Sequence, residues 1–409
     1  LRVLFVLMLV FTACKQQETK PQIDNFYATE LFEDVQLAAI YPDSKTFVDL
    51  VPKKSYTILE AEYLKLKQTP NFDLKAYVIE NFEDRSMQSL SFETDTSKNM
   101  YQHINIMWDK LTRGPDEPIM NSSRISLPKK YVVPGGRFQE IYYWDSYFTI
   151  EGLIAANRND LAKSMVDNFA FLIDSIGFIP NGTRDYYLSR SQPPFFSMMV
   201  VALARNDKAI LVEYYDTMAK EYDFFMKHDS IDRPYGADRH VVKLIGGGLM
   251  NRYFDTERTP RPEAYKEDIH LAKDKPSEKS KKDLYQDLRA AAESGWDFSS
   301  RWYQNENEFS SLMTTSILPV DLNCLMYNLE YTLEQAAAMK EDFEAASYYG
   351  QRAALRNELI KGYLWDENTG LFMDFDFKRA EKTDELTLAG VYPLFFGLAT
   401  PEQDEIVKN

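Results

Sequence analysis

The stretch PGGRFQEIYYWDSY, residues 134–147, contains the groups that narrow the choice of fold and function most. Its two adjacent glycines permit backbone conformations that are closed to other residues. Arg137 is a permanently charged fork of donors, and Trp144 offers a flat apolar face. Glu140 and Asp145 accept hydrogen bonds. By its chemistry alone, this set fits either a site that binds hydroxyl groups or a structural network of ion pairs.

The composition favours carboxylate chemistry on a neutral substrate. The chain has 409 residues, of which 44% are hydrophobic and 27% charged, as in a soluble globular protein. A net charge of -16 argues against a nucleic-acid partner, because binding to a phosphate backbone needs a basic face. The 4 histidines show no metal-ligand spacing, so we expect no metal and no cofactor.

Apolar residues recur every three to four positions in several segments, which predicts amphipathic helices. Between them lie long loops that are rich in glycine and proline, and loops of this length in a compact domain are usually functional or disordered. Their aromatic residues, alternating charges and lack of a low-complexity tract favour function. The sequence therefore predicts an all-α architecture whose loops gather at one end. The expected helices cover about 160–175, 207–225, 321–333 and 341–363, and the expected loops cover 131–147, 177–197, 246–268 and 290–302.

Three further loops carry charged and aromatic residues: IPNGTRDYYLSRSQPPF at 179–195, PRPEAY at 260–265 and AESGWDFSSRW at 292–302. Taken singly, each charged residue in them is either a ligand or a member of a salt bridge or cap. In the last loop, Trp296 and Phe298 flank Asp297. Shielding by these two rings would favour the protonated form of its carboxyl group. The alternative is a surface Asp that starts a short turn with Ser299 and Ser300.

The first stretch resembles the first signature of the trehalase family of glycoside hydrolases, PGGRFxExYxWDxY, and matches every fixed position. The other three loops match family segments in the same order. The resemblance covers about residues 24–409 and implies an (α/α)6 toroid, incomplete at its C-terminus, with the site at the loop-bearing end. It also implies hydrolysis of the α,α-1,1 bond of trehalose to two glucose molecules, with inversion.

The resemblance carries site roles onto matching residues. Asp297 matches the general acid. Thr183 departs from the Asn often found at its position and is not assigned to the substrate. The residues implied to bind the sugar are Arg137, Trp144, Asp145, Asn181, Arg190, Ser191, Gln192, Arg261, Glu263 and Gly295.

The family also has a second signature, similar to QWDxPxGW, followed by a Glu that acts as the general base. No Trp follows Trp365, and a helix that starts at Pro401 has few residues left, so we expect a clipped chain. Such a chain alone is expected to be inactive and poorly soluble. The alternative is a non-catalytic fragment that binds sugar at most. A different toroidal glycosidase, such as a glucoamylase-like enzyme, would lack the PGGRF pattern.

The N-terminal run LRVLFVLMLVFTAC resembles a bacterial lipoprotein signal that ends at Cys14, although Phe11 departs from the usual pattern. The polar residues that follow read as a tether, so we assign residues 1–23 to signal and tether. The alternative is a buried N-terminal helix. A lipid anchor at Cys14 would place the protein in a bacterial cell envelope, facing the periplasm. We expect a monomer whose partner is a small-molecule substrate, trehalose.

Overall fold

The computed structural model describes residues 25–85, 95–305 and 307–408. Cys14 and the predicted signal segment lie outside the described residues. The described part is mostly helical, which confirms the all-α prediction. The helices are α1 (Glu30–Leu37), α2 (Ser44–Val48), α3 (Tyr56–Leu66), α4 (Leu74–Asn81), α5 (Met100–Leu111), α6 (Asp145–Ala155), α7 (Asn159–Ile176), α8 (Phe196–Leu203), α9 (Ala209–Glu213), α10 (Tyr215–Met226), α11 (Tyr265–Leu271), α12 (Glu278–Glu293), α13 (Val320–Met339), α14 (Phe343–Leu364), α15 (Tyr392–Phe395) and α16 (Pro401–Lys408).

Short antiparallel strands decorate the loops between these helices. They form small sheets in the orders β1-β2, β3-β4, β5-β6-β7, β12-β11-β8 and β10-β9. The strands are β1 (Val51–Pro52), β2 (Phe82–Glu83), β3 (Thr112–Arg113), β4 (Tyr131–Val132), β5 (Ala237–Asp238), β6 (Val241–Lys243), β7 (Leu249–Asn251), β8 (Ile317–Leu318), β9 (Trp365–Asp366), β10 (Leu371–Phe372), β11 (Phe375–Asp376) and β12 (Glu381–Lys382).

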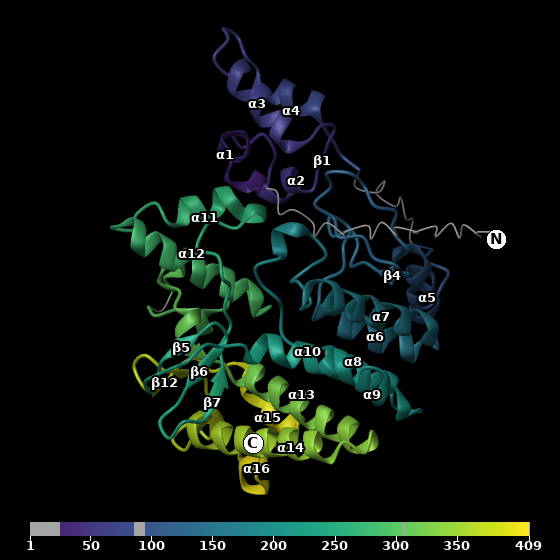
Figure 1. Cartoon of the computed structure of the whole chain (residues 1–409), viewed down its shortest axis with the longest axis vertical. Coiled ribbons are helices and arrows are strands. Elements are labelled where there is room, and N and C mark those ends of the chain that lie inside the picture. Colours follow the sequence, from purple (N-terminus) through teal and green to yellow (C-terminus); the bar gives the residue numbers. More distant parts are fainter. Residues whose placement is uncertain (1–24, 86–94, 306, 409) are drawn as a thin grey trace, which may run out of the picture.

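The longer helices are arranged around a ring, in which α13 rather than α11 lies next to α10. In Figure 1, α6, α7, α8 and α10 lie on one side, α13 and α14 along the base, and α11 and α12 on the opposite side. Neighbouring helices pack pairwise, with α7 against α8 and α10, and α13 against α10 and α14. One apolar core joins residues of all these helices except α11, which contributes partly buried side chains to its edge. The helices therefore supply a continuous apolar core. The loops between them can expose polar side chains without loss of that core.

The helices α1 to α4 form a separate layer at the end of the ring opposite α13 and α14 (Figure 1). This layer, residues 26–85, has its own aromatic core, which extends to Tyr186, Tyr187 and Tyr265 of the ring loops. Gln36 donates to the carbonyl of Pro262 at 3.1 Å, and Tyr265 donates to Glu33 at 2.8 Å. We call residues 26–85 the N-terminal cap, because it closes over two of the long loops.

The predicted amphipathic segments are helical, with one correction. The helix predicted from 207 to 225 is two helices, α9 and α10, separated at Tyr214. Tyr214 has φ -101° and ψ 8°, outside the helical region. Its ring is buried, and its hydroxyl group donates to Asp167 at 2.5 Å. Both helices bury apolar residues in the same core, so the three-to-four-residue spacing of these residues continues across Tyr214. The spacing alone therefore predicts one helix.

Local sequence also sets one hairpin turn and one helix start. The segment after Trp365 forms the β9-β10 hairpin with Gly370 at φ +68° in its turn. Thr400 caps α16, as predicted, because Gln403 N donates to its Oγ1 and Thr400 N donates to the Gln403 side chain. In the described part of the chain, no helix is long and apolar enough to cross a lipid bilayer.

Candidate active site

A cavity of about 480 Å³ opens where the four long loops meet beneath the N-terminal cap. Its polar lining combines acids, guanidinium groups and amides, while Trp144, Phe138 and Tyr187 supply aromatic faces. Such a mixture suits a polyhydroxylated ligand, which offers donors, acceptors and apolar CH faces together. The sequence-predicted site residues that line it are Arg137, Trp144, Asp145, Asn181, Arg190, Gln192, Arg261, Glu263, Gly295 and Asp297.

The first signature loop supplies one wall of the cavity. Arg137 is at its rim, with a side chain that is 60% exposed and 3.4 Å from Asp43 of the cap. Asp145 opens α6, and shielding of its carboxyl group from water by the surrounding protein raises its pKa. Trp144 N donates to Gln192 Oε1 at 3.1 Å. The hydrogen bond between Trp144 and Gln192 therefore joins the first and second loops directly at the cavity.

Gly295 lies against the ring of Trp144. A methyl group on Gly295 would be 2.5 Å from Cε2 and 2.8 Å from Nε1 of the indole. The residue also has φ +70°, which favours glycine. Only a residue without a side chain allows this approach, so Gly295 fixes the indole from behind. The predicted site residue Gly295 thus meets two separate requirements for glycine.

The second loop forms the cavity floor around Arg190, which is only 1% exposed. Its Nε donates to Asn181 Oδ1 at 2.9 Å, and its Nη2 donates to Glu263 Oε1 at 2.7 Å. Asn181 N also donates to the Arg190 carbonyl, at 3.1 Å. Charge-assisted bonds of this kind hold both partners in one geometry. The fixed side chains of Arg190, Asn181 and Glu263 are therefore preorganised rather than mobile.

Ser191 occupies a different position from its neighbours. It is buried, its Oγ donates to the Ile179 carbonyl at 2.6 Å, and its N donates to Glu293 Oε1 at 3.0 Å. It is not among the residues that line the cavity. The geometry gives Ser191 a role in holding the loop, and a direct contact with substrate stays a prediction.

Arg261 and Glu263 come from the third loop. Arg261 forms two side-chain hydrogen bonds with Asp268, of 3.0 and 2.6 Å, and its guanidinium carbon lies 4.8 Å from the centre of the Phe298 ring. Burial tends to raise the pKa of Glu263, but Arg190 and Arg261 outweigh burial and lower it. Glu263 is therefore a charged acceptor, unsuited to donate a proton.

Asp297 follows the end of α12 and presents its carboxyl group at the cavity surface. The surrounding protein still excludes enough water to raise its pKa, and the charge of Asp145 acts in the same direction. Arg261 and Arg190 oppose the rise. The net direction is upward, as expected from its aromatic neighbours, so the arrangement keeps Asp297 closer to the protonated form than a free carboxyl group.

Two polar atoms at the centre of this arrangement have no hydrogen-bond partner. Nη1 of Arg190 and Oε2 of Glu263 are both buried and unpaired within the described ranges. Nη1 lies 3.7 Å from Asp255, too far for a hydrogen bond. Unsatisfied buried groups are costly, roughly 1–3 kcal/mol each. Both residues also line the cavity, so unsatisfied polar groups lie close to its wall.

The cap also reaches the cavity, which the sequence reasoning missed. Lys45 lines it, and its Nζ contacts Glu140 at 2.6 Å, Asp49 at 2.5 Å and the hydroxyl of Tyr186 at 3.2 Å. Glu140 in turn accepts from Arg184. The residues around Lys45 give no sign that it belongs to the site, because Glu140 and Tyr186 lie 95 and 141 residues away in the sequence.

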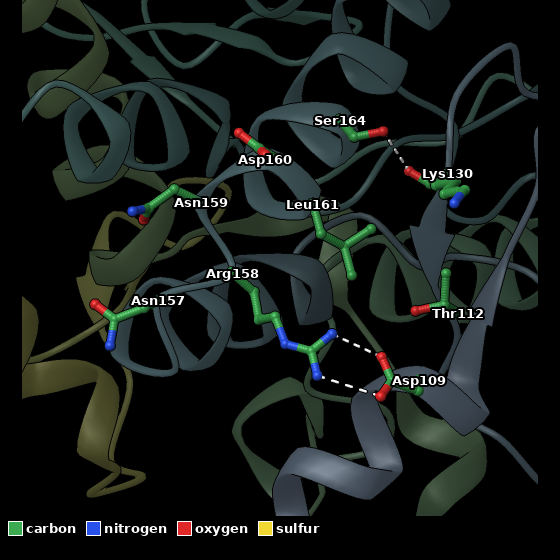
Figure 2. Close-up of a pocket in the computed structure, with 9 residues that line it drawn as sticks. All are labelled: Asp109, Thr112, Lys130, Asn157, Arg158, Asn159, Asp160, Leu161 and Ser164. Carbon is green, nitrogen blue, oxygen red and sulfur yellow. Dashed lines mark hydrogen bonds and ion pairs between the residues drawn. The ribbon is translucent and has the colours of Figure 1, made fainter.

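A larger hollow of about 670 Å³ lies elsewhere, between α5 and the start of α7 (Figure 2). In Figure 2 the guanidinium group of Arg158 faces Asp109, and the two are paired at 2.6 Å. None of the predicted site residues lines this hollow. The hollow therefore lacks the predicted site residues, and its Arg158 and Asp109 are engaged with each other. Among the described residues, no group of three or more His, Cys, Asp or Glu is arranged to hold a metal ion.

Comparisons with known proteins support the family resemblance of the four loops. The family model described as Trehalase matches residues 39–409. The neutral trehalase from Saccharomyces cerevisiae has a similar structure, with a TM-score of 0.58 and 27% sequence identity over 69% of this chain and 54% of that chain. The present chain thus spans about half the length of that relative. The likeness confirms the predicted (α/α)6 toroid type of fold.

A second solved structure with some likeness is a mannosylglycerate hydrolase of family GH63 from Thermus thermophilus, in complex with glucose. The two chains share 14% identity with a TM-score of 0.47, over 76% of this chain and 75% of that one.

Proposed function

The chain belongs to the trehalase family, and on that premise we propose that its cavity binds trehalose and serves hydrolysis of the α,α-1,1 bond. The observation that supports this most is the buried group of Arg190, Asn181 and Glu263, with its unpaired Nη1 and Oε2. Arg190, Asn181 and Glu263 all line the cavity, so a sugar ring that enters it would meet their polar side chains. The indole face of Trp144 offers a stacking surface close by.

In the proposed mechanism, Asp297 donates a proton to the bridging oxygen as the bond to the anomeric carbon breaks. Its raised pKa favours the protonated form that this step needs. Arg190 and Arg261 bind hydroxyl groups and limit how far the pKa of Asp297 rises. Glu263 stays charged beside Arg190 and accepts from the sugar.

Inversion also requires a carboxylate on the opposite face of the sugar, which activates a water molecule. We assign that role to neither Asp145 nor Glu263, because each is proposed as a sugar ligand. The family resemblance places the base on a Glu that follows a second signature, and residues 1–409 contain no such signature. What these residues supply is therefore binding and proton donation. Placement in a bacterial envelope through a lipid on Cys14 is a further proposal, for which the signal-like run at 1–14 is the support.

Isothermal titration of the 409-residue protein with trehalose tests the binding part. We expect saturable binding of trehalose, weaker binding of maltose, and loss of binding in Arg190→Met. Maltose is the matched control because it contains the same glucose rings in another linkage. Equal affinity for both disaccharides would contradict the proposed substrate, and no saturable binding of either would contradict a sugar site.

Proton NMR of a trehalose solution tests the chemistry. Inversion predicts that one α-glucose and one β-glucose form first from each trehalose. Binding without any product is the outcome expected if these residues supply only binding and proton donation. Formation of α-glucose alone would contradict the inverting mechanism.

A further inference from the structure

We propose that Glu293 is the positioning residue of the site, a buried carboxylate that holds two ligand-bearing loops in register with Asp297. The inference rests on the proposed function for what the loops bind, and on the contacts of Glu293 for how they are held. Glu293 is the last residue of α12 and is fully buried. It does not line the cavity, so it acts through other residues.

Each oxygen of Glu293 receives a backbone N–H from a different loop. Ser191 N donates to Oε1 at 3.0 Å, and Phe254 N donates to Oε2 at 2.6 Å. Ser191 is next to Arg190 and Gln192, two of the residues that line the cavity. Phe254 begins the segment that continues to Arg261 and Glu263. One carboxylate therefore holds the loop that bears Arg190 at a fixed distance from the loop that bears Glu263.

His240 completes the arrangement. Its Nε2 lies 3.0 Å from Oε1 and 3.2 Å from Oε2 of Glu293. Because a carboxylate only accepts, Nε2 carries the proton that faces Glu293. The imidazole is itself buried, with the rings of Phe224 and Phe225 each 5.1 Å from it. Glu293 is thus held from three directions.

The position of Glu293 in the chain links these loops to the proton donor. Ser294 follows directly, and its Oγ accepts from Trp296 N at 3.0 Å. Gly295, which packs against Trp144, and Asp297 come next. A shift of the Glu293 carboxylate would therefore move the second and third loops relative to Trp144 and Asp297.

The substitution Glu293→Gln tests this directly. The amide keeps the shape of the side chain but replaces one acceptor oxygen by an NH₂ group, which faces a backbone donor. We expect faster hydrogen–deuterium exchange at the amides of 190–195 and 252–263, measured by mass spectrometry on the full chain. We also expect trehalose affinity to fall by roughly tenfold or more, since loss of a charge-assisted bond to a fixed loop has effects of this order.

The matched control is Glu330→Gln. Glu330 is equally buried and pairs with Arg356 through bonds of 2.9 Å between α13 and α14. Its loss should destabilise the fold without changing trehalose affinity or exchange in the two loops. The conservative variant Glu293→Asp keeps the charge and should recover part of the affinity that Glu293→Gln loses.

Unchanged exchange in both loops of Glu293→Gln would overturn the inference, whether or not any sugar binds. Faster exchange with wild-type trehalose affinity would overturn it too, because the loops would then move without consequence for the site. If the wild-type protein binds no trehalose, the proposed function fails, and the exchange measurement alone decides whether Glu293 holds the loops.

Discussion

Gly295 lies directly against the indole of Trp144, and a methyl group on Gly295 would approach Cε2 of that ring to 2.5 Å. Through this contact the loop that bears Asp297 packs directly on the first signature loop, and both residues line the cavity. The fit depends on a glycine for two reasons, the lack of room and the positive φ of +70°. The two reasons can be separated by experiment.

Gly295→Ala should destabilise the fold by roughly 2–4 kcal/mol, because both overpacking and backbone strain contribute. The matched control is Gly177→Ala at the end of α7, where φ is +99° and nothing lies within 4 Å of the added carbon. Gly177→Ala should lose only about 1–2 kcal/mol from strain. Urea unfolding measures both, and equal losses would show that the contact with Trp144 is unimportant. Trehalose affinity should fall in Gly295→Ala alone.

Asp297→Asn should reduce hydrolysis by roughly 10²–10⁴-fold while trehalose binding is kept, because an amide cannot donate the proton. The comparison requires a protein that turns over, and the binding measurement applies in any case. In the wild type, the raised pKa of Asp297 predicts that the rate falls as pH rises through that pKa, since the protonated form is the active one. A pH–rate profile without this alkaline limb would contradict the assignment.

Arg190→Lys should weaken trehalose binding by about 10–100-fold, because an ammonium group cannot satisfy Asn181, Glu263 and a ligand in the same plane. Arg356→Lys is the control, since it disturbs a similarly buried pair with Glu330 outside the cavity. Both variants should unfold more easily, and only Arg190→Lys should lose affinity in titration calorimetry. Loss of affinity in both variants would mean that reduced stability of the whole fold, and not loss of a ligand contact at Arg190, weakens binding.

Glu221 should make stability depend on pH. Burial raises its pKa to about 8 from 4.5, although a hydrogen bond from Tyr143 lowers it somewhat. Between these two values the folded chain holds the proton more tightly than the unfolded chain, so this contribution is complete below pH 4.5 and is lost as pH rises through about 8. The slope is at most about 1.4 kcal/mol per pH unit.

Glu221→Gln should remove this pH dependence and leave the protein more stable than the wild type in alkaline solution. Melting temperatures measured from about pH 5 to about 9 check it. The exposed Glu367→Gln controls for the loss of one charge and should follow the wild-type profile. A wild-type curve that is flat over this window would rule out a buried, protonated Glu221.

The parts of the fold that could be predicted from sequence are those set by local repetition. Leu161, Met165 and Phe169 recur at helical spacing, and all three pack into the main core. Local capping chemistry at Thr400 likewise predicts the start of α16. The break at Tyr214 could not be predicted, because the apolar spacing continues through it from α9 into α10.

The site divides in the same way. Most residues that line the cavity could be predicted, because they lie within a few positions of one another in the four family-like sequence patterns of the loops. Lys45, Glu293 and His240 escaped the sequence reasoning, since their partners lie far away along the chain. The Ser191 side chain donates to the Ile179 carbonyl, and its contact with substrate stays a prediction. Buried polar partners that hold a site from behind have no local sequence pattern.

The N-terminal cap has a consequence for how the protein reaches its native state. Tyr265 reaches back to Glu33, 232 residues earlier, and Gln36 bonds to Pro262 across 226 residues. During synthesis the cap emerges before the ring, yet part of its aromatic surface stays uncovered until residues near Tyr265 have left the ribosome. Closing so long a segment is entropically unfavourable and slow. Folding of the site is therefore a late event, and nascent chains should depend on chaperones until the cap can dock.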